Sequence, residues 1–308
     1  MKKHIVLLLI ICLILTFCKE KSKPSKQSVT TTETLSEHLE GLNERIANAA
    51  IQREFDLISD LYLDSTLLIA AYQPLLDGKH KIKAFYVETY HRQDLADYSR
   101  ETVEIIDFEN YVLEIGLFQK LFSDGSQLQG KYFNNWLKGT DGKLYLRAES
   151  FGFFGEPENK EDYRVMFLTD DNEPLKGRNG KIIPMELQVY NAFGENLVRD
   201  RNTQGVVDSY TKDGIYFPFA DTAKTGYDGL LKHFTAYHKY PVKIDSIEVW
   251  TYDYDQVDDG IIRYNRFFVR WTLPDGNTGE SSGAGIAYWK RTSDNTLKTH
   301  RHIGTHIY

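Results

Sequence analysis

The feature that most constrains the fold is an internal repeat of residue types between the two halves of the chain. Pairs 153 positions apart are Gly130 and Gly283, Trp136 and Trp289, Lys138 and Arg291, Asp141 and Asp294, Leu144 and Leu297, and Tyr111 and Tyr264. Pairs 148 positions apart are Tyr62 and Tyr210, Gly78 and Gly226, and Ile82 and Leu230. Self-similarity at a fixed distance indicates a duplication. One insertion of about five residues in the second copy explains both offsets.

The first copy begins with apolar residues at helical spacing from Leu39 to Leu61, for which Ser36 is the expected N-cap. A short apolar stretch over 66–72 and a second helix over 78–90 follow. The expected strands of this copy are 102–108, 111–118, 127–136 and 143–153.

The second copy is expected to repeat this order of elements. Its expected helical segments are 185–211 and 226–238, with an apolar stretch at 215–219 between them. Its expected strands are 243–254, 261–273, 282–291 and 296–308. Helices on one face of a curved antiparallel sheet make an α+β architecture. We therefore predict two domains, 36–154 and 185–308, joined by a Pro-, Gly- and charge-rich linker, 155–184.

Two segments of the second copy carry a family resemblance. YTKDGIYFPFADTAKTGYDGLLKHF (210–234) and GIAYWKRTSDNTLKTHRH (285–302) resemble SnoaL-like and related members of the nuclear transport factor 2-like superfamily. The resemblance covers 185–308 and, more faintly, 36–154. It implies a tandem pair of cones, each a curved sheet wrapped on helices around a pocket that several members use as an active site.

Members that resemble ketosteroid isomerase place a carboxylate base just before a proline after the first strand, and a tyrosine on the first helix. The second copy departs from both, because Phe217 precedes Pro218 and Gly194 stands about where the tyrosine is expected. The matching stretch of the first copy, 67–74, holds no carboxylate. The nearest acid, Asp221, fits a turn. That mechanism is therefore not expected.

The best polar constellation lies on the last expected strand. Alternation places His300, His302 and His306 on one face. Imidazoles at i and i+2 can meet at one point, which suits acid-base work or metal binding. Because no third ligand is identifiable, no metal and no cofactor is expected, and structural histidines are favoured over a catalytic pair. The first copy has Arg147 and Glu149 at the matching positions, so a site based on His300 and His302 would belong to the second copy alone.

Aromatic and basic residues of the second meander are candidates for lining a pocket for a flat apolar or aromatic ligand. They are Tyr264, Arg266, Phe268, Arg270, Trp271 and Tyr288. Core packing is the favoured interpretation of the aromatics, and surface ion pairs that of the arginines. The acidic run 252–260 lacks the ligand pattern of an EF-hand, so we expect a solvated hairpin turn there.

The N-terminus indicates export. Lys2 and Lys3 precede an apolar run, 5–15, that is shorter than the roughly 20 residues of a membrane span. The segment 15–18 resembles a lipobox, with Phe17 where a small residue is usual. The resemblance implies that 1–17 are a signal peptide, that Cys18 carries lipid, and that 18–35 are a flexible tether. We expect a lipid-anchored protein of the cell envelope that faces the periplasm.

Cysteine usage and charge exclude several classes of function. Of Cys12 and Cys18, only Cys18 would stay in the mature chain, which excludes thiol catalysis and Cys-ligated zinc. Loss of Lys2 and Lys3 takes the formal charge from -7 to -9, which is unfavourable for binding nucleic acid.

Three hypotheses remain. The chain is a binder of a small molecule or protein partner, or an isomerase, cyclase or dehydratase with a His-based site in the second copy, or a structural module. Its copies are expected to pair within one chain or between chains in a homo-oligomer.

Overall fold

The computed structural model describes residues 34–165, 168, 177–178 and 180–307. The predicted signal peptide, Cys18 and nearly all of the predicted tether lie outside these residues. From Leu35 onward the chain forms one compact unit. None of the described helices has the length and apolar character needed to cross a membrane.

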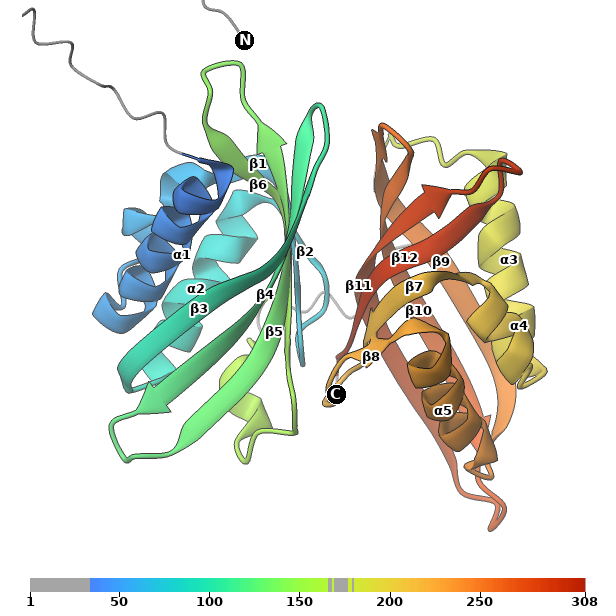
Figure 1. The fold of residues 1–308 in the computed structure, drawn as a ribbon. Coiled ribbons are helices and arrows are strands. Elements are labelled where there is room, and N and C mark those ends of the chain that lie inside the picture. The colour runs from blue at the N-terminus through green and yellow to red at the C-terminus, as the bar shows by residue number, and fades with distance from the viewer. Residues whose placement is uncertain (1–33, 166–167, 169–176, 179, 308) are drawn as a thin grey trace, which may run out of the picture. The chain divides into compact units, whose positions relative to one another are not determined.

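The first copy is a six-stranded sheet with helices on one face (Figure 1). The strand order is β2-β1-β6-β5-β4-β3. Its helices are α1 (Leu35–Gln52) and α2 (Lys79–Arg92). Its strands are β1 (Tyr62–Ala70), β2 (Leu76–Asp77), β3 (Leu95–Asp107), β4 (Tyr111–Phe122), β5 (Gln127–Lys138) and β6 (Leu144–Phe153).

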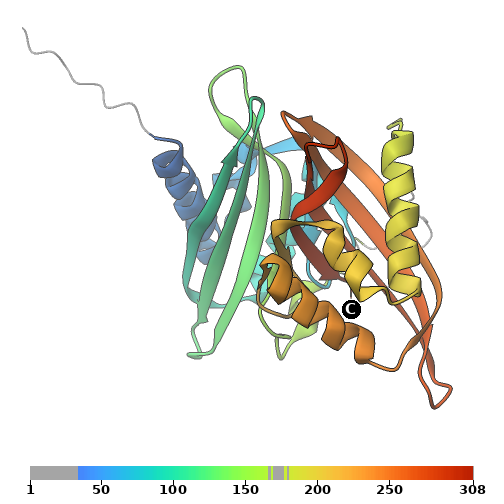
Figure 2. The same ribbon diagram turned by 45° about the vertical axis from the view of Figure 1, so that its right-hand side comes forward.

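The second copy has the same topology, in the order β8-β7-β12-β11-β10-β9. Its helices are α3 (Met185–Arg199), α4 (Thr203–Asp208) and α5 (Gly226–Lys239). Its strands are β7 (Tyr210–Phe217), β8 (Lys224–Thr225), β9 (Lys243–Val257), β10 (Gly260–Thr272), β11 (Thr278–Arg291) and β12 (Leu297–His306). Figure 2 shows the curvature of its long strands. The predicted α+β class and the tandem duplication are confirmed. The sheets are mixed, however, because β1 and β7 run parallel to β6 and β12.

Two helix boundaries differ from the prediction. Helix α1 begins at Leu35, so Ser36 lies inside the first turn and is not the N-cap. The helical segment expected over 185–211 is divided into α3 and α4 at Arg201, whose φ of 50° is left-handed. The Asn202 side chain then caps α4 by accepting a hydrogen bond from the Gly205 N–H at 2.9 Å.

Equivalent β-bulges in the two copies give structural evidence of the duplication. In the first copy Arg147 is the unpaired residue between two pairs of β5 and β6, and in the second copy His300 is the unpaired residue between two pairs of β11 and β12. Val103 on β3 and Tyr252 on β9 are a second such pair of bulged residues. A bulge bends its strand and reverses the alternation of faces beyond it.

Strand pairing corrects one of the sequence equivalences. Trp136 pairs with Val112 in the first copy, and Trp289 pairs with Ile261 in the second. Strand β10 therefore matches β4 at an offset of 149, so Tyr111 and Tyr264 are not equivalent positions. Most of the inserted residues lie in the hairpin between β10 and β11. The offset between the copies is therefore 149 before this hairpin and 153 after it.

The faces of the two sheets that do not carry helices share one apolar core. This shared core contains residues of both copies, all buried. They are Leu67, Ile69, Leu75, Phe108, Leu113, Ile115, Phe133 and Ala148 of the first copy, and Phe217, Tyr252, Val257, Ile262, Tyr264, Ala284, Ile286, Tyr288 and Ile303 of the second. Burial of apolar area of this extent is the main stabilising term available to either sheet.

A buried charged cluster lies beside the shared core. Arg147 of the first copy binds Asp253 at 2.5 Å and Asp255 at 3.1 Å, and its guanidinium lies 4.8 Å from the centre of the Tyr264 ring. Asp253 is 1% exposed and Asp255 is 8% exposed. The acidic run 252–260 does contain the expected turn, after Val257, but these two carboxylates are buried rather than solvated.

We predict that Arg147→Ala lowers the free energy of unfolding by about 3 kcal/mol, because it leaves Asp255 buried without a cation. Urea denaturation followed by fluorescence measures this change. The control is Arg270→Ala, which removes an exposed ion pair with Glu280 and is expected to change stability by less than about 1 kcal/mol. Equal effects of the two substitutions would contradict the assignment of Arg147 as a buried contact.

Candidate functional site

The two copies can be compared position by position on the faces that carry their helices, which we call the interior faces. In the first copy, cross-strand rows are formed by Glu114, Asn134 and Glu149, and by Gly116, Tyr132 and Phe151. In the second copy, the same rows are Arg263, Ala287 and His302, and Asn265, Gly285 and Gly304. Because the registers agree, each residue has a defined counterpart.

The interior of the first copy is filled by its own side chains around Glu114. This carboxylate is fully buried and accepts hydrogen bonds from five side chains. The donors are Asn43 at 2.6 Å, Thr102 at 2.6 Å, Tyr132 at 3.0 Å, Asn134 at 3.1 Å and Trp136 at 2.8 Å. The anion is thus satisfied by the protein itself.

Glu149 is the second buried carboxylate of the first copy. It accepts hydrogen bonds from Tyr62 at 2.8 Å and Tyr86 at 2.7 Å, and Arg100 lies 3.6 Å from its other oxygen. Lys120 is also buried, and burial followed by the charge of Arg100 lowers its pKa to about 7. The remaining cavity has a volume of about 20 Å³, room for about one water molecule. The two interior acids are matched by two interior bases.

The second copy has a buried cation at the position of Glu114. Arg263 is 6% exposed and donates to Thr251 at 2.9 Å and to Asn191 at 2.5 Å, while its guanidinium lies 4.8 Å from the Trp289 ring centre. Within the described part of the chain it forms no ion pair. Burial lowers its pKa to about 9.

His302 occupies the position of Glu149. Its Nδ1 is 3.0 Å from the Tyr210 hydroxyl, and its ring stacks on Tyr216 with centroids 4.9 Å apart. Burial, and next the charge of Arg263, lower its pKa to about 3. The Nε2 atom lies 3.4 Å from the position that a Cβ of Gly285 would take.

Two glycines leave the interior of the second copy without the aromatic side chains that fill the first. Gly285 and Gly304 are cross-strand partners, as are Tyr132 and Phe151 at the same positions of the first copy. A Cβ at Gly304 would meet the Tyr216 hydroxyl at 3.4 Å, which is ordinary contact. Asn265, the neighbour of Gly285, is 7% exposed and its Oδ1 has no hydrogen-bond partner among the described residues.

The bulge separates the two predicted histidines. His300 is the bulged residue, so its surroundings differ from those of His302. Its Nδ1 is 2.8 Å from Thr211 Oγ1, and its ring lies edge-on to Tyr288 of the shared core at 5.5 Å. Arg147, the counterpart of His300, also faces the other copy. His302 therefore faces the interior without His300 beside it.

The six predicted ligand-lining residues lie in several places. Tyr264 and Tyr288 belong to the shared core, where Tyr264 donates to Asp255 at 2.5 Å and Tyr288 donates to Asp259. Arg270 forms an exposed ion pair with Glu280 at 2.9 Å, and its guanidinium lies 5.3 Å from the Phe268 ring centre.

The other two candidates are partly exposed. Trp271, near the hairpin after β10, donates to Ser281 at 3.0 Å. Arg266 lies two residues from Tyr264 on β10, on the same face of the strand, which is the face that contributes to the shared core.

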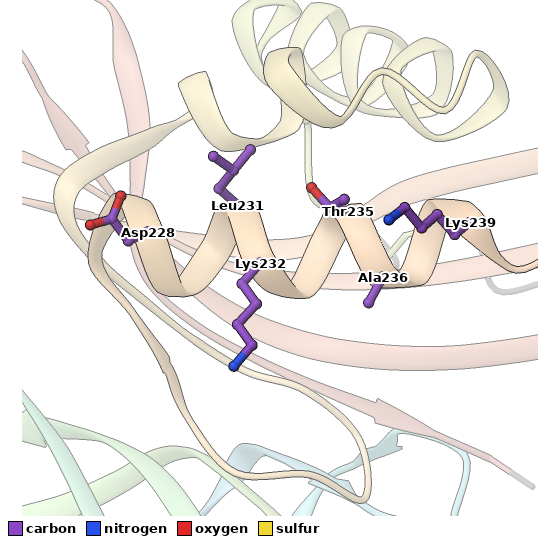
Figure 3. A pocket seen from close by; sticks show the side chains of 6 residues that line it. All are labelled: Asp228, Leu231, Lys232, Thr235, Ala236 and Lys239. Atoms are coloured by element: carbon purple, nitrogen blue, oxygen red, sulfur yellow. The ribbon is translucent and has the colours of Figure 1, made fainter.

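Two other features do not provide a site. A shallow depression of about 430 Å³ is lined by residues of α5 alone, and their side chains do not converge (Figure 3). They are Asp228, Leu231, Lys232, Thr235, Ala236 and Lys239. Among the described residues, no group of three or more His, Cys, Asp or Glu residues could hold a metal ion.

The chain was compared with family models, curated proteins and solved structures. No family model matches the chain, and no curated protein matches its sequence. A ketosteroid isomerase-like protein from Erwinia carotovora atroseptica is 17% identical with a TM-score of 0.36, covering 41% of this chain and 99% of its own. ActVI-ORFA from Streptomyces coelicolor is 17% identical with a TM-score of 0.33, covering 39% and 92%.

A conserved protein from Planctomyces limnophilus is 12% identical with a TM-score of 0.36, covering 40% of this chain and 95% of its own. The likeness to nuclear transport factor 2-like proteins concerns the fold alone.

We predict that His302 makes stability fall with falling pH. Its folded-state pKa of about 3 lies below the ordinary 6.5, so between these values the unfolded chain binds a proton that the folded chain does not. His302→Gln should therefore remove a slope of up to about 1.4 kcal/mol per pH unit. Urea denaturation across this window measures it, with His80→Gln on the surface of α2 as control. Identical slopes for wild type and His302→Gln would refute the prediction.

Proposed function

We propose that the second copy binds a small organic molecule against its interior face, and that the first copy serves as a filled scaffold domain. The observation that carries this proposal is the pair Gly285 and Gly304, which stands where the first copy has Tyr132 and Phe151. Aromatic residues fill interiors, and their replacement by glycines removes that filling.

The exposure of the interior residues supports the same proposal. His302, Gly304 and His306 on β12 are all partly exposed, as is Tyr216 on β7. Of their counterparts on β6 in the first copy, Glu149 and Phe153 are 0% and 1% exposed, and Phe151 is partly exposed. The interior face of the second copy is therefore covered less completely along β12 than that of the first, and aromatic rings border it, as in sites for flat ligands.

The low pKa of His302 favours a binding function over catalytic turnover. A general base is most effective when its pKa lies near the working pH, and burial beside Arg263 takes the pKa of His302 far below neutrality. His300, the other predicted catalytic residue, contacts Thr211 and Tyr288 instead of the interior. We therefore propose a binding protein and not an isomerase, cyclase or dehydratase.

We predict that Gly304→Phe, which restores the aromatic residue of the first copy, abolishes binding of the neutral fluorescent probe N-phenyl-1-naphthylamine to the full-length protein. Gly304→Ala is expected to weaken it less, since its Cβ makes only ordinary contacts with Tyr216. A fluorescence titration gives affinity and stoichiometry, with one molecule bound per chain expected.

The matched control is Gly152→Ala in the first copy, whose Cβ would lie 3.6 Å from the Lys131 side chain. It should leave the titration unchanged. Because residues with side chains favour strands over glycine, both Gly304 variants should unfold at or above the wild-type Tm. Unchanged probe binding in both Gly304 variants would contradict the proposed site.

We also propose that the protein is held at a membrane of the cell envelope by lipid on Cys18. The support is the sequence of the N-terminus, with Lys2 and Lys3, the apolar run 5–15 and the lipobox-like segment 15–18. One acyl chain alone gives only weak membrane binding, and several chains on one cysteine give stable attachment.

We expect Cys18→Ala to abolish incorporation of labelled palmitate in a bacterial host and to stop signal cleavage at residue 17. The measurement is autoradiography with the mass of the purified chain, and Cys12→Ala is the control. Labelling that persists in Cys18→Ala would refute the anchor.

A further inference from the structure

We propose that the ligand of the second copy is a small carboxylate, whose negative charge is held by Arg263 and which donates a hydrogen bond to Asn265 through a second polar group. This inference rests on the proposed binding function and specifies the chemistry of its ligand. Its basis is a reversal of charge between equivalent positions of the two copies.

The reversal concerns Glu114 of the first copy and Arg263 of the second. Both are buried in the same cross-strand row. The side chains that surround them are also equivalent. Asn43 and Asn191 come from the first helix of each copy, and Thr102 and Thr251 come from the strand beside them.

These neighbours act as hydrogen-bond donors in the first copy and as acceptors in the second. Asn43 donates its N–H to Glu114, whereas Asn191 presents its carbonyl oxygen to Arg263. Thr102 donates to Glu114, and Thr251 accepts from Arg263. The polar side chains around this position are therefore oriented to bind a cation in the second copy, and Asn191 and Thr251 hold the Arg263 guanidinium in place.

Among the described residues, none balances the charge of Arg263 in the second copy. In the first copy Arg100 and Lys120 offset the two interior acids, but Val249 and Val269 stand at their positions on β9 and β10. The acid nearest to these positions on α3, Glu195, accepts a hydrogen bond from the Val249 N–H at 2.8 Å. No carboxylate among the described residues pairs with Arg263. An isolated buried charge is costly, and an anionic ligand removes that cost.

The second part of the proposal comes from an acceptor that has no donor. Asn265 lies two residues from Arg263 on the same face, so the two side chains are separated by roughly 7 Å along the strand. Its Oδ1 and the Nε2 of His302 lie 3.3 and 3.4 Å from the Cβ position of Gly285. Both atoms thus lie beside the backbone of Gly285, at a point where the Ile303 carbonyl leaves no room for a side chain. A hydroxyl or amine on the ligand would satisfy Asn265.

The experiment compares two probes of the same shape, 4-hydroxybenzoate and its neutral amide 4-hydroxybenzamide, by calorimetric titration of the full-length protein. We expect the carboxylate to bind at least about tenfold more tightly than the amide, because charge-assisted hydrogen bonds are the stronger ones. Benzoate, which lacks the donor for Asn265, should bind more weakly than 4-hydroxybenzoate.

Variants separate ligand binding from a structural role of Arg263. Arg263→Leu should lose the preference for the carboxylate and at the same time raise the Tm, because it removes an unpaired buried charge. An arginine with only a structural role would lower the Tm instead. Arg263→Lys keeps the charge and should retain part of the preference. Arg270→Leu, on the same strand but exposed, is the matched control and should bind as wild type does.

The outcomes distinguish this inference from the function on which it rests. Equal affinity for carboxylate and amide, no binding of either up to the solubility limit, or a preference that survives Arg263→Leu overturns the anionic ligand. In these cases the loss of N-phenyl-1-naphthylamine binding in the Gly304→Phe variant would still support the interior site. If Gly304→Phe changes the binding of no probe, the interior site itself is refuted, and the anionic ligand with it.

Discussion

The buried contact between the helix-free faces of the two sheets is the interaction on which the remainder of the structure depends. A sheet that carries helices on only one face needs a cover for the other, and here each copy provides that cover through the shared core. Arg147 adds a charged contact in which Asp253 and Asp255 lose their water. Because this contact stabilises both sheets from behind, the interior of one copy need not be filled to the density of an ordinary core.

Much of the fold could be predicted from the sequence, because it depends on local patterns. The repeat at 153 positions identified Trp136 and Trp289 correctly, and helical and alternating periodicity gave the order of elements. Boundaries that depend on one residue's backbone were missed, such as the turn at Arg201 that divides α3 from α4. The parallel pairing of β7 with β12 was also missed, since pairing partners far apart in sequence leave no mark on local periodicity.

The candidate site was predicted only in part, for two physical reasons. Alternation assumes a regular strand, but the bulge at His300 shifts the faces, so only His302 of the predicted pair reaches the interior. The importance of Arg263 depends on its counterpart, and residue matching at 153 hid Glu114 because the longer hairpin of the second copy follows β10. Arg263 was not among the predicted ligand-lining residues, because by alternation it faces away from Arg266 and lies in the interior.

The equivalence of the surrounding residues explains how one framework can hold either charge. An amide carries a donor and an acceptor, and a hydroxyl can act as either, so Asn and Thr at fixed positions can surround an anion in one copy and a cation in the other. The difference between the two copies then comes from the charged and aromatic residues around this Asn and Thr. Valines at the positions of Arg100 and Lys120 leave the buried charge of Arg263 without a counter-ion among the described residues. An unbalanced buried charge costs stability, and sites that bind ligands commonly carry such a cost. The first copy, whose interior is filled, is attached through the shared core, and the apolar area buried there stabilises both copies.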